Sequence, residues 1–145
     1  MTTSTNDLLN RLQILLERSL PMYLSYAPPH TLKSQSGVLS VLSQMVEDQK
    51  RAVDRISLLI AENGGVVDHG EFPITFTSLH DLSAEYLVKM TIERQKRTIT
   101  AIEKIADQLT FAPFAQGLAR EVIGEAKGHL ENLEELERDL AATPA

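Results

Sequence analysis

Apolar residues recur at helical spacing along most of this chain, and only one long stretch interrupts the pattern. The spacing predicts four helices, at residues 6–27, 34–63, 78–109 and 113–141. The link between the first and second helices is short, as is the link between the third and fourth, so each of these pairs should be antiparallel. The middle link, residues 64–78, is far longer than a helical hairpin needs. This single long link limits the possible folds more than any other feature.

The middle link can return along the whole length of a helical bundle. The second helix, of about 28 residues, would be roughly 42 Å long. The extended link would span at most roughly 50 Å. Phe72, Ile74 and Phe76 alternate along it, so one side of the link is expected to pack on the helices. We therefore predict a single all-α domain over residues 1–145, a four-helix bundle of two antiparallel hairpins joined by one long crossover.

Proline, glycine and capping residues predict where these helices bend or end. Pro21 removes a backbone donor inside the first helix and is expected to kink it. Gly64 and Gly65 should stop the second helix, because glycine adopts left-handed backbone angles without a steric penalty. Ser78 with Asp81 three residues later resembles a capping pair at the start of the third helix.

Composition excludes several functional classes. The chain has 20 acidic and 14 basic residues and a net charge of -6, which disfavours nucleic acid or an anionic membrane as a partner. The sequence contains no cysteine, so disulfides and thiolate metal ligands are excluded. The start MTTSTNDLLN lacks the basic region of a signal peptide, and no apolar run approaches the ~18 residues of a membrane span. We therefore expect a cytoplasmic protein.

Each predicted helix also carries one polar residue where its stripe predicts an apolar one. These residues are Ser19, Gln49, Gln95 and His129. All four fall near the middle of a helix, so they should meet in one neutral polar layer at the centre of the bundle. The simplest interpretation is a hydrogen-bonded core network that helps to fix the register of the helices. His129 would then bond within the layer, to Gln95 or to Glu125.

Two segments give this pattern a family resemblance. RISLLIAENGG resembles the end of the second bacterioferritin helix, and GHLENLEEL resembles the segment around its fourth-helix histidine. Together with the predicted topology, the whole chain resembles the ferritin-like superfamily, which includes bacterioferritin and rubrerythrin. The resemblance implies a layer that holds two irons, with a glutamate from each of two helices and a Glu-x-x-His pair from each of the others.

Most of the ligands that the resemblance implies are replaced in this chain. The two single glutamates fall on Ser19 and Gln95. The two pairs fall on Gln49 with Ala52 and on Ala126 with His129, so one ligand of the family set is kept. Two iron ions need several carboxylates to balance their charge, and amides and hydroxyls do not supply them. We therefore predict a non-catalytic protein without a cofactor, with a degenerate metal site, that acts through protein association.

One alternative keeps a metal. Asp48 borders the apolar stripe of the second helix, and Glu125 lies one turn before His129. With Glu93, these residues could form a reduced, mononuclear site for a single iron, manganese or zinc ion. The protein would then be a metal-binding protein or a metal-dependent oxidoreductase.

The remaining apolar and basic residues lead to predictions about the surface. Leu9, Leu16, Leu20 and Tyr23 form a second stripe on the first helix, which favours a homodimer through the faces of helices 1 and 2. The alternative is a monomer in which the crossover covers this stripe. His69 with Asp68 and Glu71 is interpreted as a solvated turn in preference to a surface metal site. A salt-bridged, exposed face is predicted for the basic cluster Lys89, Arg94, Lys96 and Arg97.

Overall fold

The computed structural model describes residues 4–79 and 82–142, and this part of the chain is built of helices and loops without a β-strand. The prediction of an all-α protein is confirmed. The helices are α1 (Thr5–Glu17), α2 (Leu20–Tyr26), α3 (Ser36–Glu62), α4 (Ala84–Gln108) and α5 (Pro113–Ala142), with short 3-10 turns at Lys33–Gln35 and Ile74–Ser78. No helix of these residues is both long and apolar enough to cross a membrane.

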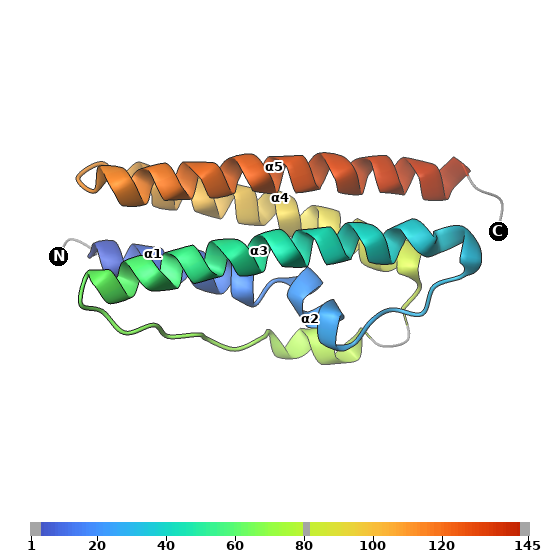
Figure 1. The fold of residues 1–145 in the computed structure, drawn as a ribbon. Helices are drawn as coiled ribbons and strands as arrows, with labels where there is room; N and C mark the ends of the chain where they lie inside the picture. The colour runs from blue at the N-terminus through green and yellow to red at the C-terminus, as the bar shows by residue number, and fades with distance from the viewer. Residues whose placement is uncertain (1–3, 80–81, 143–145) are drawn as a thin grey trace.

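The helices form two antiparallel pairs (Figure 1). Helices α1 and α2 follow one another, and α3 runs back beside them, whereas α4 pairs with α5. The segment between α3 and α4 returns along the side of α1 and α2 that faces away from α5 (Figure 1). The long middle link therefore makes the end-to-end return that its length predicts.

The first predicted helix, residues 6–27, is two helices rather than one kinked helix. Helix α1 ends at Glu17, and Ser19 has extended backbone angles before α2 begins at Leu20. Pro21 lies in the first turn of α2, where its missing N–H is not needed. The hydroxyl of Ser19 accepts a hydrogen bond from the backbone N–H of Met22 at 3.3 Å and caps the new helix. Proline thus ends one helix and starts another.

Helix α3 ends at the predicted glycine pair. Gly64 has a φ of +80°, and Gly65 N–H donates to the carbonyl of Ile60 at 2.9 Å. The crossover then lies against α1, where the side chain of Asn10 forms two hydrogen bonds with the backbone of Asp68, at 3.0 and 2.8 Å. The turn around Asp68 therefore ties the crossover to α1.

The predicted start of the third long helix at Ser78 is wrong. Residues Ile74–Ser78 form a 3-10 turn, and α4 begins at Ala84. Ser83 caps α4, because its hydroxyl accepts from the N–H of Tyr86 at 3.2 Å. The expected cap residue Asp81 lies outside the described residues. The three-residue period of the turn also breaks the predicted alternation, so that Phe76 is buried but Ile74 is 84% exposed.

The second apolar stripe of the first helix is covered within one chain. Leu9, Leu16 and Leu20 are almost fully buried. The ring of Tyr23 packs against Phe72 and Phe76 of the crossover, with 5.5 Å between ring centroids in each pair. This stripe therefore gives no reason for a dimer, and its burial agrees with the monomer alternative.

Two apolar clusters make up the core, one toward each end of the bundle. The first contains Leu12, Ile56 and Ile102, and the second contains Met45 and Leu133. Polar side chains lie between the two clusters. The core is therefore interrupted near its middle, at the level where the sequence predicts a polar layer.

Candidate functional site at the central polar layer

Three residues of the predicted layer, Gln49, Gln95 and His129, line one small cavity between the helices. They come from α3, α4 and α5, and each residue is buried, with 4%, 4% and 6% of the whole residue's surface exposed. The free space at the centre of the cavity is about 10 Å³, enough for one water molecule at most. The cavity has no room for an organic substrate.

Ser19 joins the layer through Gln49 rather than through the cavity. Its hydroxyl donates to Oε1 of Gln49 at 2.8 Å, and the same oxygen caps α2. A hydroxyl can donate one hydrogen bond and accept others, so one serine serves both purposes. On the other side of the layer, Nε2 of Gln95 donates to the backbone carbonyl of Ala126 at 3.0 Å.

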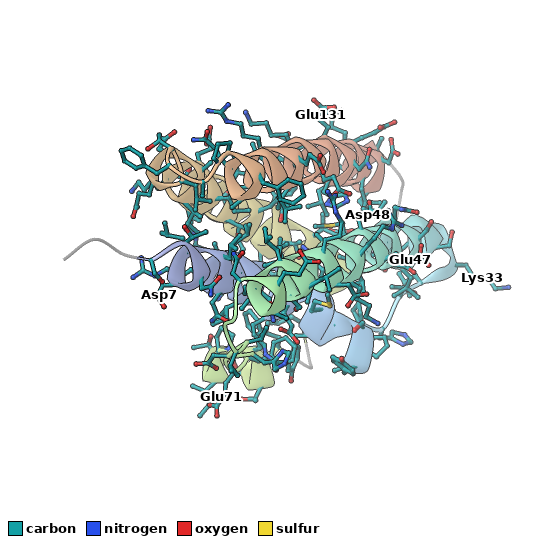
Figure 2. All side chains as sticks on the ribbon, turned by 60° about the vertical axis from the view of Figure 1, so that its left-hand side comes forward. Asp7, Lys33, Glu47, Asp48, Glu71 and Glu131 are labelled. Atoms are coloured by element: carbon teal, nitrogen blue, oxygen red, sulfur yellow. The ribbon has the colours of Figure 1, made fainter. Side chains whose placement is uncertain are left out.

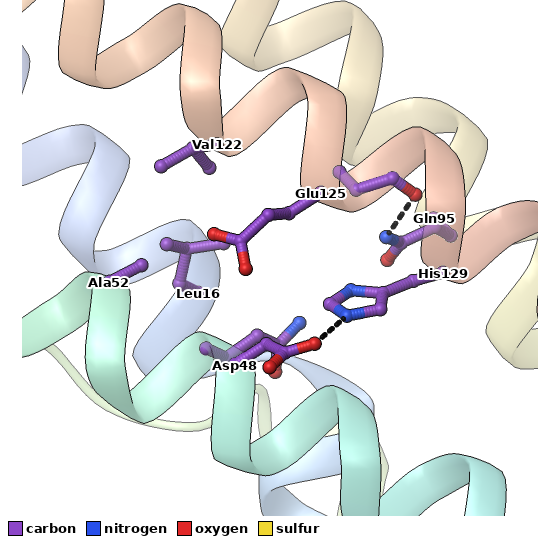
Figure 3. A pocket seen from close by; sticks show the side chains of 9 residues that line it. Leu16, Asp48, Ala52, Gln95, Val122, Glu125 and His129 are labelled. Carbon is purple, nitrogen blue, oxygen red and sulfur yellow. Dashed lines mark hydrogen bonds and ion pairs between the residues drawn. The ribbon is translucent and has the colours of Figure 1, made fainter.

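His129 bonds to Asp48, not to the expected Gln95 or Glu125. Figure 3 shows the imidazole of α5 pointing at the Asp48 carboxylate of α3, and Nε2 lies 2.7 Å from Oδ2. An ionised carboxylate can only accept, so Nε2–H is the donor. Both side chains are largely shielded, with 8% of His129 and 17% of Asp48 exposed. The contact between α3 and α5 in the layer is therefore short and largely shielded from water.

Asp48 brings a negative charge into a layer that the sequence predicts to be neutral. Partial burial raises the pKa of its carboxyl, but the hydrogen bonds from His129 and Gln44 and the positive charges of His129 and Arg51 outweigh burial. The pKa of Asp48 is therefore below its usual value, and the group is ionised at neutral pH. Gln44 Nε2 lies at 3.2 Å and Arg51 Nη1 at 3.3 Å from Oδ1.

The residues of the alternative metal site are only partly brought together. Glu125 lines the cavity with Asp48 and His129, and Figure 3 shows its carboxylate directed into it. Glu93 is exposed and pairs with Lys96 at 3.7 Å. Glu93 precedes Gln95 by two positions, which turns it about 200° around the helix axis, away from the layer. The structure therefore does not bring Glu93 to the site.

A second polar cluster, which the sequence analysis missed, lies around Gln13 on α1. Gln13 is fully buried, accepts from the hydroxyl of Ser57 at 2.9 Å and donates to Glu17 at 3.0 Å. Glu17 in turn lies 2.9 Å from Nδ1 of His69. Gln13 lies four residues after Leu9, so it falls on the second apolar stripe of the first helix. The sequence predicts that this stripe is a dimer surface, not part of the core. His69 belongs to this cluster and fastens the crossover, so the interpretation as a solvated turn is incomplete.

Three separate hydrogen bonds hold the polar side chains around His129: Ser19 to Gln49, Gln95 to the Ala126 carbonyl, and His129 to Asp48. Within residues 4–79 and 82–142, no buried side-chain nitrogen or oxygen of the layer lacks a partner. Comparison of the chain with protein-family models, curated proteins and solved structures found no significant match to any of them. The functional assignment therefore depends on the geometry of the chain itself.

Proposed function

We propose that the central layer is a structural network and that the protein is a non-catalytic member of the ferritin-like group, without a cofactor. The observation that carries this proposal is that the buried polar groups of the layer are already hydrogen-bonded within the protein. Ser19 bonds to Gln49, Gln95 to the Ala126 carbonyl and His129 to Asp48, and the space of about 10 Å³ between them admits no substrate. The two antiparallel helix pairs and the long crossover support the ferritin-like part of the proposal.

In this proposal the layer holds the helices in register. The bond from Ser19 to Gln49 joins α2 to α3, and the bond from Gln95 to the Ala126 carbonyl joins α4 to α5. The pair of His129 and Asp48 joins α5 to α3, and thus one hairpin to the other. These polar contacts disfavour movement of one helix along the axis of its neighbour, because the displaced helix would leave a buried polar group unpaired.

A double-mutant cycle on the pair of Asp48 and His129 tests the structural role. Each of Asp48→Asn and His129→Leu should destabilise the protein, and the double variant should lose less than the sum. The expected coupling is about 1 kcal/mol or more, measured by urea denaturation. The pair of Glu103 and Lys127, which are exposed and 4.0 Å apart, is the control and should show little coupling. A coupling for Asp48 and His129 as small as that of the control would contradict the proposal.

The second part of the proposal is action through protein association, beginning with a homodimer on the face of α2 and α3. A groove of about 410 Å³ opens between these helices, and its lining includes Leu24, Leu42, Val46 and the half-exposed Leu39. Ferritin-like bundles commonly pair through helices 1 and 2, which correspond here to α1 with α2 and to α3, and an apolar groove on this face suits a second copy.

Sedimentation equilibrium at micromolar concentration tests the dimer directly. Leu39→Glu should shift the chain to a monomer, because it places a charge inside the proposed contact. Leu58→Glu is the matched control, since Leu58 is 61% exposed on α3 but does not line the groove. A wild-type monomer, or equal effects of the two variants, would contradict this interface.

A single metal ion at the layer is the second candidate function. One observation favours it: Asp48, Glu125 and His129 line the same cavity. An ion there would have to replace the proton that Nε2 of His129 shares with Asp48. Titration with Mn²⁺, Fe²⁺ or Zn²⁺ would then raise the melting temperature of the wild type, and the effect would be lost in Glu125→Gln and in His129→Leu. Equal shifts in all three proteins would exclude a site at this cavity.

A further inference from the structure

A second pocket lies between the crossover, α4 and the junction of α1 and α2. Its free volume is about 210 Å³. Leu15, Leu20 and Phe76 supply apolar walls, and Arg18 and Arg94 bring two guanidinium groups to the same pocket. The proposed structural network uses neither of these two cations. Two arginines in one pocket are notable in a chain whose net charge is -6.

Arg94 is a partly buried cation in this pocket. Its Nε is buried and has no hydrogen-bond partner, and its Cζ lies 4.6 Å above the ring centre of Phe76. Burial lowers the pKa of Arg94, and the charge of Arg97 lowers it further. The basic cluster was expected to be an exposed, salt-bridged face. Lys96 pairs with Glu93 as expected, but Arg94 forms no ion pair with any described residue.

Arg18 also lines this pocket, although its charge interacts with the Glu17 carboxylate. Its Cζ lies 4.8 Å from the ring centre of Phe72, and its Nε donates to the backbone carbonyl of His69 at 3.0 Å. Within the described parts of the chain, Arg18 also has no ion pair at 4.0 Å or closer. Stacking on a ring fixes the plane of a guanidinium and leaves its N–H edge available for an acceptor. Each of the two arginines therefore presents donors that an anion could satisfy.

We propose that this pocket binds a small organic monocarboxylate, with the carboxylate on Arg94 and Arg18 and an apolar body on Leu15, Leu20 and Phe76. A planar carboxylate matches the paired N–H groups of a guanidinium, and its negative charge balances the positive charge of Arg94. The volume is below the roughly 300–1,000 Å³ of pockets for drug-sized ligands, so the body must be small.

Glu71 selects for a single negative charge. It lines the same pocket, and Figure 2 shows it at the outer surface, on the opposite side of the molecule from Glu131 of α5. A carboxylate in the lining repels every anion, and it repels the doubly charged form of inorganic phosphate more than a monocarboxylate. Apolar walls beneath it favour a ligand that also has a hydrocarbon part.

Isothermal titration with benzoate, hexanoate and inorganic phosphate tests the site. Benzoate or hexanoate should bind one molecule per chain, and phosphate should bind more weakly. Arg94→Gln should weaken the binding about ten-fold or more, the loss expected for one charge-assisted contact. Arg97→Gln is the matched control. It removes the same charge about one helical turn after Arg94, and the side chain of Arg97 does not line the pocket. It should change the affinity less than about two-fold.

Two further measurements separate loss of binding from loss of folding. Arg94→Gln should melt at or above the wild-type temperature, because it removes an unpaired cation, and only the wild type should melt higher when benzoate is added. Glu71→Gln should bind benzoate more tightly than the wild type does. The proposal is overturned if the wild type binds neither carboxylate at millimolar concentration, if it prefers phosphate, or if Arg94→Gln binds as well as Arg97→Gln.

Discussion

Replacing Ser19 with alanine separates the role of the polar layer from ordinary helix capping. Ser19 caps α2 through the N–H of Met22 and also donates to Gln49. Ser83 caps α4 through the N–H of Tyr86 and, among residues 4–79 and 82–142, donates no second bond of this kind. The two serines thus make the same cap, and they differ in the bond that Ser19 adds to a buried glutamine.

The two substitutions should lower the free energy of unfolding by different amounts. Ser83→Ala loses one cap and should cost about 1 kcal/mol of unfolding free energy. Ser19→Ala loses a cap and also leaves Oε1 of the buried Gln49 without its donor, which adds about 1–3 kcal/mol. The expected total for Ser19→Ala is about 2–4 kcal/mol. A further change of Gln49 to leucine removes the unpaired group and should restore part of the loss.

Urea denaturation followed by circular dichroism measures all of these variants on one scale. The expected order of stability is wild type, then Ser83→Ala, then Ser19→Ala with Gln49→Leu, and last Ser19→Ala alone. Equal losses for Ser19→Ala and Ser83→Ala would show that the bond to Gln49 contributes nothing beyond capping. A double variant less stable than Ser19→Ala would refute the claim that the unpaired amide causes the loss.

Two further predictions concern acid stability and the end of α3. Because the folded pKa of Asp48 is lowered, its contribution is present at neutral pH and is lost as the pH falls through that pKa, below the usual value of 3.8. The difference in unfolding free energy between wild type and Asp48→Asn should therefore be largest near neutral pH and shrink below about pH 4. Urea denaturation at several pH values measures it, and a difference that does not change with pH would contradict the lowered pKa. Gly64→Ala should cost about 1–2 kcal/mol because its φ is +80°. Gly124→Ala, inside α5 with open space around it, should stabilise by about 0.5–1 kcal/mol in thermal unfolding, and the same sign for both would refute the backbone argument.

Helical spacing and glycine chemistry were enough to predict the main features of the fold. The predicted helix 113–141 differs from α5 by one residue, and Gly64 ends α3 as expected. The polar layer could be found because Gln49, Gln95 and His129 interrupt otherwise apolar stripes. Such interruptions can be read from a single sequence, since they depend only on the period of one helix.

The partners within the layer depend on how helices are rotated against each other, which one-helix periodicity does not determine. Asp48 lies beside Gln49, one position away from the stripe, yet it is the residue that meets His129 across the bundle. Pro21 was expected to bend a helix, but the capping ability of Ser19 allowed a complete break. Arg94 was grouped with exposed charges, because the sequence does not show that the crossover places Phe76 against it.

Metal content tests the central claim about the layer most directly. The protein, purified without chelators, is analysed by elemental mass spectrometry beside His129→Leu. Iron, manganese and zinc should be at background in both samples, because the imidazole is already bonded to Asp48 in a cavity of about 10 Å³. One equivalent of any of these metals in the wild type, lost in His129→Leu, would contradict a structural layer and establish a metal site in its place.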